Sequence, residues 1–295
     1  MKLVKLILIA ACLSGATAAV ADNEDTLKKI KESGKITMGV RESSSPLSYL
    51  DANQLPIGYH IDICKAIIED VKKKIGVPDL KIEMQTVTSQ NRIPLVSNGT
   101  VDIECGSTTN SIARQKQVAF AYTTFVANTR MVVKKPSRIT SITQLDGKQV
   151  ATTQGTTAVA LMRTIEKSKN IDFQKIFGKD HAESFLLLET DRAVAFVMDD
   201  NILIGLIANS RSPLLYHIVG DSLSTEPYGI MMRKNDPDFK KIADTTIARM
   251  MKSGEIDKLY AKWFMGKIPP KNTSLNFEMS QELKALIKNP NDKGI

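Results

Sequence analysis

Arginines, hydroxyl side chains and one acidic pair stand directly after the apolar segments that we predict to be strands. They are Arg41; Ser89 and Arg92; Ser107, Thr108 and Thr109; residues 153–157; and Asp199 with Asp200. Because ligands of open α/β sheets bind at the carboxyl ends of the strands, we expect these side chains to meet in one site. Their chemistry suits a ligand with two carboxylates and one ammonium group.

Each of these residue types has a physical reason to contact such a ligand. An arginine holds a carboxylate through two parallel hydrogen bonds. Residues 107–109 precede a helix predicted to start near Ser111, where free backbone N–H groups attract an anion, and residues 155–157 do the same for a second helix. Asp199 follows an apolar strand, where its carboxylate can accept hydrogen bonds from an ammonium group.

Simpler interpretations exist for the same residues. Thr109, Asp199 and Asp200 are also common helix N-caps, and Arg92 could pair with a surface acid. His181, which precedes a predicted helix, could donate to a ligand carboxylate or lie exposed in a loop. The binding interpretation gains weight because the strand-end positions occur in both halves of the chain.

The spacing of apolar residues predicts an α/β fold. Residues 35–105 follow the order strand, helix, strand, helix, strand, and residues 129–199 repeat this plan. Such an order indicates a mostly parallel sheet with helices on both faces. The last third, from residue 228, is helix-rich and would return to cover the first sheet.

We therefore predict two lobes, each a mixed, mostly parallel sheet flanked by helices. Lobe one would comprise residues 22–124 and 221–295, and lobe two residues 125–220. The chain would cross between them near residues 122–126 and 217–221. Two connecting strands of this kind permit a hinge that closes over a ligand.

The first 21 residues have the features of a secretory signal peptide. Lys2 and Lys5 precede an apolar run, and residues 19–21 (Ala-Val-Ala) provide a cleavage site. The apolar run is shorter than the roughly 20 residues that a membrane-spanning helix needs. The segment that ends at Cys12 resembles a lipoprotein processing box, so a lipid anchor at Cys12 is the alternative.

Charge and cysteine content narrow the choice of function. Cleavage would lower the formal net charge from +8 to +6, because the leader carries two lysines and no acid. The lysines are scattered and aromatic residues make up 5% of the chain, which argues against nucleic-acid binding. No Cys/His spacing indicates a metal site. Cys64 and Cys105 would form either a disulfide or two buried thiols.

Several segments are similar to those of one family. The chain resembles the periplasmic solute-binding proteins of ABC transporters for polar amino acids, family three, and within them the subgroup that binds glutamate and aspartate. The similarity spans residues 27–292. It is carried by GVRESSSP (39–46), TSQNRIP (88–94), NGT (98–100), ECGSTTN (104–110), RQK (114–116), GTT (155–157), KDH (179–181), RAVAF (192–196), MDD (198–200), IPPKN (268–272) and PNDK (290–293).

The resemblance implies the two-lobed α/β fold of a type II periplasmic binding protein. It further implies a monomer without a cofactor or metal that captures L-glutamate or L-aspartate in the periplasm and delivers it to a membrane permease. Arg92, helped by Ser107 and Thr109, would hold the ligand α-carboxylate, and Asp199 would accept the α-ammonium.

The same family pattern implies how the second carboxylate of the ligand is recognised. Arg41, Ser89 and His181 would contact it, with Thr157 supporting from lobe two. Two other functions stay open: an enzyme on the same fold, such as a dehydratase, and a surface-exposed lipoprotein or adhesin. No nucleophile–base pair, metal set or cofactor motif supports the enzyme, and a lipid anchor at Cys12 would favour the adhesin.

Overall fold

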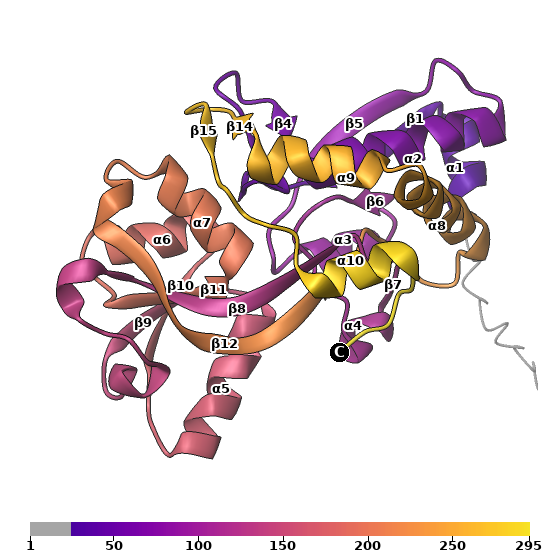
Figure 1. The fold of residues 1–295 in the computed structure, drawn as a ribbon. Coiled ribbons are helices and arrows are strands. Elements are labelled where there is room, and N and C mark those ends of the chain that lie inside the picture. The colour runs from indigo at the N-terminus through magenta and orange to yellow at the C-terminus, as the bar shows by residue number, and fades with distance from the viewer. Residues whose placement is uncertain (1–24) are drawn as a thin grey trace, which may run out of the picture.

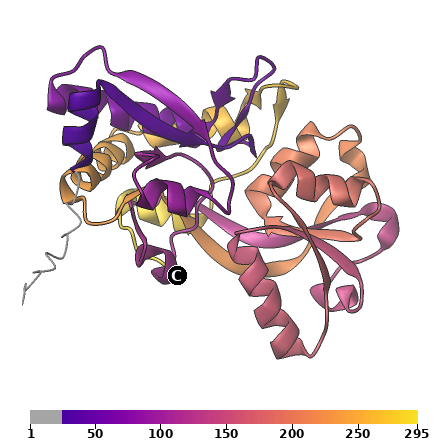
Figure 2. The ribbon, with the colours of Figure 1, turned by 180° about the vertical axis from the view of Figure 1, so that it is seen from behind.

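The computed structural model describes residues 25–295, so the predicted signal peptide and the alternative lipid site at Cys12 lie outside the described residues. Two five-stranded sheets lie side by side, each with helices packed on its faces (Figure 1). The view from behind shows that two long strands, β8 (Phe125–Lys134) and β12 (Tyr216–Tyr228), join the two lobes (Figure 2).

The first sheet has the strand order β5-β1-β6-β13-β7. Its strands are β1 (Lys35–Val40), β5 (Lys81–Thr86), β6 (Ile103–Glu104), β7 (Val118–Phe120) and β13 (Met231–Arg233). β1 runs parallel to β5 and β6, whereas β13 runs antiparallel to β6 and β7. The sheet is therefore mixed, because β13 enters it only when the chain returns from the second lobe.

Helices cover both faces of the first sheet. They are α1 (Thr26–Ser33), α2 (Tyr59–Ile75), α3 (Arg92–Ser97) and α4 (Ile112–Gln115), and a small sheet of β2 (Ser43–Ser44), β3 (Ser48–Leu50) and β4 (Pro56–Ile57) precedes α2. In α2, Ile63, Ile67 and Val71 recur at helical spacing and are fully buried in the main core. The helix ends where Gly76 adopts a left-handed conformation with φ of 71°.

The second sheet has the order β10-β9-β11-β8-β12. Besides β8 and β12 it contains β9 (Gln149–Thr153), β10 (Gln174–Gly178) and β11 (Ala195–Asp199), and its helices are α5 (Thr157–Lys169), α6 (His181–Glu189) and α7 (Asp200–Asn209). Short 3₁₀ turns occupy Lys135–Ser137, Ile142–Leu145 and Pro213–Leu215. The side chains of β11 alternate between two cores, one against α5 and one against α6 and α7.

β12 corrects one expectation about the return of the chain. His217–Val219 lie beside Met131–Val133 inside the second sheet, and pairing with β8 continues to Tyr228 after an irregularity between Val219 and Ser224. The return connection therefore lies nearer Tyr228 than residues 217–221. Gly220 and two exposed polar residues interrupt the apolar alternation there, which gives this part of the strand the composition of a linker. The lobe limits themselves stay a prediction.

The last third closes the first lobe. Its elements are α8 (Pro237–Lys252), α9 (Glu255–Tyr260), a π-helical turn (Ala261–Met265), β14 (Lys267–Ile268), β15 (Thr273–Ser274) and α10 (Gln281–Lys288). Tyr260 and Phe264 stack on Phe125 at the start of β8, with ring centroids 6.3 and 4.9 Å away. The first-lobe core therefore holds the base of the strand that leads to lobe two.

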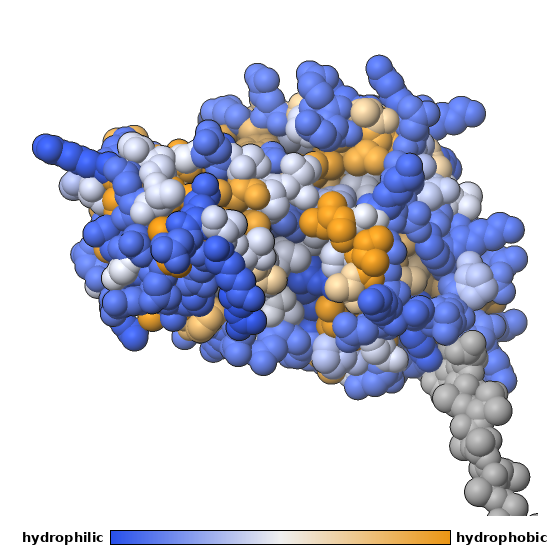
Figure 3. Space-filling model, turned by 90° about the horizontal axis from the view of Figure 1, so that it is seen from below, coloured by the Kyte–Doolittle hydropathy of each residue, from blue (hydrophilic) through white to orange (hydrophobic). Residues whose placement is uncertain are grey.

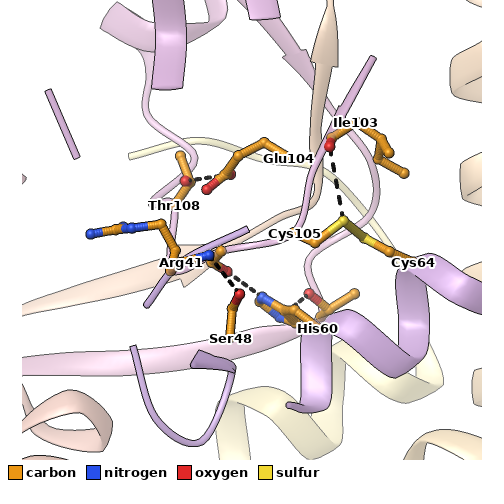
Figure 4. Close-up of a disulfide and its surroundings, with 10 residues drawn as sticks. Arg41, Ser48, His60, Cys64, Ile103, Glu104, Cys105 and Thr108 are labelled. Atoms are coloured by element: carbon orange, nitrogen blue, oxygen red, sulfur yellow. Dashed lines mark hydrogen bonds between the residues drawn. A yellow bond between two sulfur atoms is a disulfide. The ribbon is translucent and has the colours of Figure 1, made fainter. Parts of the chain in front are cut away.

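Cys64 and Cys105 form a disulfide, which resolves the alternative between a bond and two thiols. The bond ties α2 to the residue after β6, and both cysteines are fully buried (Figure 4). Seen from below, the surface is largely hydrophilic with small apolar patches (Figure 3). In residues 25–295 no helix has the length and hydropathy to cross a membrane.

Candidate functional site

Three buried arginines lie at the edge of the first sheet that faces the second lobe. Arg41 follows β1 and donates from Nη2 to Ser89 Oγ at 3.0 Å and from Nη1 to Ser107 Oγ at 3.5 Å. Arg92 opens α3 and donates from Nη1 to the Ser107 carbonyl at 2.8 Å. Arg114, on α4, donates to the Thr109 carbonyl at 2.9 Å.

These guanidinium groups concentrate positive charge in a buried place. Burial and then the neighbouring Arg92 lower the pKa of Arg41 to about 10, so Arg41 still carries its charge at neutral pH. Burial and then Arg92 likewise lower the pKa of Arg114 to about 10. The hydrogen bonds of all three go to hydroxyl and carbonyl oxygens rather than to carboxylates. The cluster therefore has charge available for an anionic ligand.

The segment after β6 is shaped by one glycine. A Cβ on Gly106 would come within 2.2 Å of Glu104 Oε1 and 2.8 Å of Arg41 Cγ, so a larger residue here would displace these two buried side chains. Thr108 Oγ1 donates to Glu104 Oε2 at 2.7 Å (Figure 4). His60 on α2 further holds the Gly106 carbonyl through Nδ1. The disulfide and these contacts fix the residues that carry Ser107 and Thr109.

The helix expected near Ser111 is α4, and some of the N–H groups at its start already have partners. α4 is a single turn, and the Ser111 hydroxyl already accepts from Arg114 N at 3.3 Å. The N–H of Asn110 donates to the Pro227 carbonyl and that of Ile112 to the Ile295 carbonyl. Positive charge on this side therefore comes mainly from the arginine side chains, and Ser111 caps the single turn of α4.

A second group of side chains, from lobe two and β12, is acidic. Asp199 accepts from Thr129 Oγ1 at 2.7 Å and from the Tyr228 hydroxyl. Burial and the Glu226 carboxylate raise the pKa of Asp199 to about 7. Thr157 Oγ1 donates to Glu226 Oε2 at 3.0 Å. Asp199 stands at the N-cap position of α7 but makes no side-chain capping bond, so the simpler capping interpretation fails for it.

His181 is buried rather than exposed in a loop. It is 1% exposed, and Nδ1 lies 2.9 Å from Thr153 Oγ1. Burial and then the charges of Arg41 and Arg92 lower its pKa well below the usual range, so the imidazole is neutral. Its Nε2 has no hydrogen-bond partner among the described residues. When Thr153 donates to Nδ1, Nε2–H is a free donor on the side of the arginines.

The two lobes touch around these residues. Arg114 Nη2 donates across to the Gly155 carbonyl at 3.3 Å, and a Cβ on Gly155 would lie 2.7 Å from the backbone of Gln90. On α7, a Cβ on Gly205 would lie 2.4 Å from the Ser45 carbonyl oxygen. Glycine at both positions lets the backbones of the two lobes approach closely.

The structure brings the eight residues singled out from the sequence to one region between the lobes. They are Arg41, Ser89, Arg92, Ser107, Thr109, Thr157, His181 and Asp199. Their roles toward a ligand stay predictions.

Sequence reasoning missed Arg114, Thr129, Glu226 and Tyr228. The alternation of Ser224, Glu226 and Tyr228 along one face of β12 was the available signal, but the strand was expected to have left lobe two by then.

Comparison with known proteins agrees with this geometry. Residues 36–266 match the model of the bacterial extracellular solute-binding proteins, family 3. The chain is 49% identical over 288 residues to the glutamate/aspartate import solute-binding protein of Salmonella typhimurium, a match that covers 95% of each chain. It is 48% identical over 286 residues to the L-glutamate/L-aspartate-binding protein of Pseudomonas aeruginosa, covering 97% of this chain and 95% of the relative.

A solved structure shares the architecture. The ancestral amino acid-binding protein AncCDT-1, described as a precursor of cyclohexadienyl dehydratase, superposes with a TM-score of 0.69 at 29% identity, covering 81% of this chain and 99% of that one. The fold is that of a type II periplasmic binding protein. The chain belongs to the bacterial extracellular solute-binding proteins, family 3.

Proposed function

We propose that this protein captures L-glutamate or L-aspartate between its two lobes and delivers it to the permease of an ABC transporter. The Salmonella and Pseudomonas relatives carry this ligand pair in their names, and the similarity runs through nearly the whole chain. We further propose that the chain acts as a monomer in the periplasm after loss of residues 1–21.

The proposal depends mainly on one observation: a group of buried arginines faces a group of buried acids between the lobes. Arg41, Arg92 and Arg114 are buried without carboxylate hydrogen-bond partners among residues 25–295, and Asp199 with Glu226 lies across from them. An amino acid with a side-chain carboxylate supplies two negative groups and one positive group, so it complements both sets. Buried charges are tolerated when they are paired, which favours this ligand class over neutral ones.

Each group then has a stated role. Arg92, whose Nε has no partner in the described part of the chain, holds the α-carboxylate together with Ser107 and Thr109. Asp199 accepts the α-ammonium. These contacts are common to all amino acids, so they set affinity rather than side-chain preference.

The other residues read the side chain of the ligand. Arg41, positioned by Ser89, and the neutral His181 donate to the second carboxylate. Thr157, from lobe two, donates a hydrogen bond to Glu226 and so helps to hold the closed arrangement of the lobes. Closure excludes water, which strengthens each charged hydrogen bond in the site.

We propose that these groups bind a ligand and do not catalyse a reaction on it. The pKa of Asp199 is raised to about 7, and Thr129 and Tyr228 each donate one hydrogen bond to its oxygens, which leaves lone pairs that an ammonium group can use. No cluster of three metal-binding side chains occurs in the part of the chain that the structure describes. The relation to a dehydratase precursor makes the enzyme the competing function, and a surface-exposed lipoprotein or adhesin remains the other.

Calorimetric titration of the protein without residues 1–21 against a panel of amino acids tests the proposal. Glutamate and aspartate should bind at micromolar concentration or tighter and be recovered unchanged by NMR after prolonged incubation. Binding of no acidic amino acid would sink the proposal, and conversion of the bound amino acid would favour the enzyme.

A further inference from the structure

Glu226 is a second buried carboxylate beside Asp199. The two side chains are 2% and 1% exposed. In the second sheet Asp199 pairs with Thr129, and Thr129 pairs with Ser224. Side chains alternate along a strand, so Ser224 and Glu226 share one face of β12. This register brings acids that are far apart in sequence to one threonine.

Thr129 lies between the two carboxylates. Its hydroxyl is 2.7 Å from Asp199 Oδ1 and 3.5 Å from Glu226 Oε1. A hydroxyl can accept one hydrogen bond and donate another. Thr129 can therefore accept from a protonated Asp199 and donate to an ionised Glu226, which connects the two acids through a single group.

The remaining partners of the pair are neutral. Glu226 accepts from Thr157 Oγ1 at 3.0 Å and from Ser224 Oγ at 2.5 Å, and Asp199 accepts from Tyr228. Two like charges that share a buried site disfavour double ionisation. Hydroxyl donors stabilise a carboxylate but supply no positive charge to offset a second one.

Some of the charged groups around the pair favour ionisation of the two acids, and others oppose it. Arg92 from α3 and Arg114 from α4 interact favourably with the negative charge of Asp199, and Arg114 also with that of Glu226. Asp200 from α7 opposes ionisation of Asp199. Burial and Glu226 dominate, because the pKa of Asp199 rises to about 7 despite the hydrogen bonds from Tyr228 and Thr129.

We propose that Asp199 and Glu226 form a carboxyl–carboxylate pair that holds one proton before the ligand binds and releases it when the ligand ammonium enters. The proposal rests on the proposed function, since it requires a ligand with an ammonium group. The carboxyl O–H bond breaks and the proton passes to solvent. The ammonium N–H groups then donate to both carboxylates, so one positive charge replaces another.

Glu226 is thereby a specificity-determining residue for the ammonium end of the ligand. Because binding releases a proton, the affinity for the ligand should fall as the pH is lowered. Below about pH 7 the pair is increasingly protonated, so affinity should fall toward tenfold for each pH unit. Above about pH 8 the pair is ionised and the affinity should level off until the ammonium itself titrates.

The test is calorimetric titration with L-glutamate near pH 6.5 in several buffers of different ionisation enthalpy. The slope of the observed heat against that enthalpy gives the number of protons released. We expect between roughly half and one proton for the unmodified protein. Glu226→Gln should release less than about 0.2 proton while still binding, because an amide cannot share the proton.

Asp221→Asn is the matched control, because Asp221 is an exposed acid on the same strand. This variant should release as many protons as the unmodified protein. Binding of L-glutamate without proton release, or equal release by Glu226→Gln, would overturn the proposal and leave the proposed function intact. Absence of binding to the unmodified protein would overturn both. If Glu226→Gln fails to fold, the pH dependence of the unmodified protein decides.

Discussion

At the scale of single residues, Arg41 and Arg92 differ in what their guanidinium groups contact. Arg41 donates to two serine hydroxyls, whereas Arg92 donates to a backbone carbonyl and keeps Nε without a partner among the described residues. A backbone-anchored arginine suits the group that every amino acid shares. Arg41, close to His181, suits the group that only acidic amino acids carry.

Substitution of these arginines should therefore give two different patterns. Arg92→Ala should abolish binding of every amino acid, whereas Arg41→Ala should weaken the binding of acidic amino acids most. Loss of a buried charged hydrogen bond costs roughly 2–5 kcal/mol of binding free energy. Calorimetry on both variants, with the exposed Arg211→Ala as control, measures this. A glutamate affinity within threefold of normal in Arg41→Ala would refute the side-chain assignment.

His60 makes a further prediction at the residue scale. Its Nδ1 must donate to the Gly106 carbonyl, and Nε2 then accepts from Thr124 Oγ1 at 2.9 Å. Burial lowers the pKa of His60 to about 4. The pKa of His60 is therefore lower in the folded state than in the unfolded state. Burial of the neutral imidazole is fully tolerated above about pH 6.5, and about 3 kcal/mol of the free energy of unfolding is lost as the pH falls toward 4.

His60→Phe should flatten that part of the pH dependence. It should also cost about 1–3 kcal/mol at neutral pH, because the Gly106 carbonyl loses its buried partner. Urea unfolding at pH 7 and pH 5 measures both effects. An unchanged difference between the two pH values would show that His60 is not the group that titrates.

At the scale of elements, β6, the disulfide and the His60–Gly106 contact together position Ser107 and Thr109. The bond closes a chain segment with a sequence separation of 41 and anchors Cys105, two positions before Ser107. In the chain-entropy account a loop of this length stabilises the fold by about 4 kcal/mol. Both cysteines belong to the main core.

Replacement of both cysteines by alanine should lower the free energy of unfolding by about 2–4 kcal/mol. Glutamate affinity should fall less than tenfold, because His60 still holds the Gly106 carbonyl. Denaturant unfolding and calorimetry of the double variant test this. A hundredfold loss of affinity with little loss of stability would mean that the disulfide positions the site directly.

The elements also show what the sequence could and could not predict. Apolar runs such as residues 35–40 predicted several strands of both sheets, because a largely buried strand leaves a clear pattern, but β7 and β12 were not predicted. The polar residues after these strands were predictable for the same topological reason. Glu226 was not, since its position depends on the register of β12 with β8 across an irregularity. The disulfide was also undecided, because two cysteines do not reveal whether they bond.

At the scale of the whole molecule, Gly155 is a point of close approach between the two lobes. Its φ is +78°, and an added Cβ would lie 2.7 Å from the Gln90 backbone of the other lobe. Gly147 has a similar φ of +67° but nothing within 4 Å of the same added atom. Substitution of Gly147 should therefore cause backbone strain alone, whereas substitution of Gly155 should cause the same strain and also obstruct closure of the lobes.

Gly155→Ala should lower glutamate affinity by about tenfold or more, because closure is a population shift that the added methyl group opposes. Gly147→Ala should leave the affinity unchanged, although both variants incur left-handed backbone strain of about 1–2 kcal/mol. Calorimetry gives the affinities, and X-ray scattering with glutamate present should show a larger radius of gyration for Gly155→Ala. Equal affinities for the two variants would mean that contact at Gly155 does not limit closure.

Selection for an acidic ligand is tested by comparing L-glutamate with L-glutamine in calorimetry on the protein without residues 1–21. The two ligands have nearly the same shape and differ in the charge of the side-chain end. Buried Arg41 and neutral His181 should favour glutamate by at least about a hundredfold, in keeping with roughly 3 kcal/mol for a charged hydrogen bond in a closed site. Equal affinity for the two ligands would contradict the assignment of this protein as a binder of acidic amino acids.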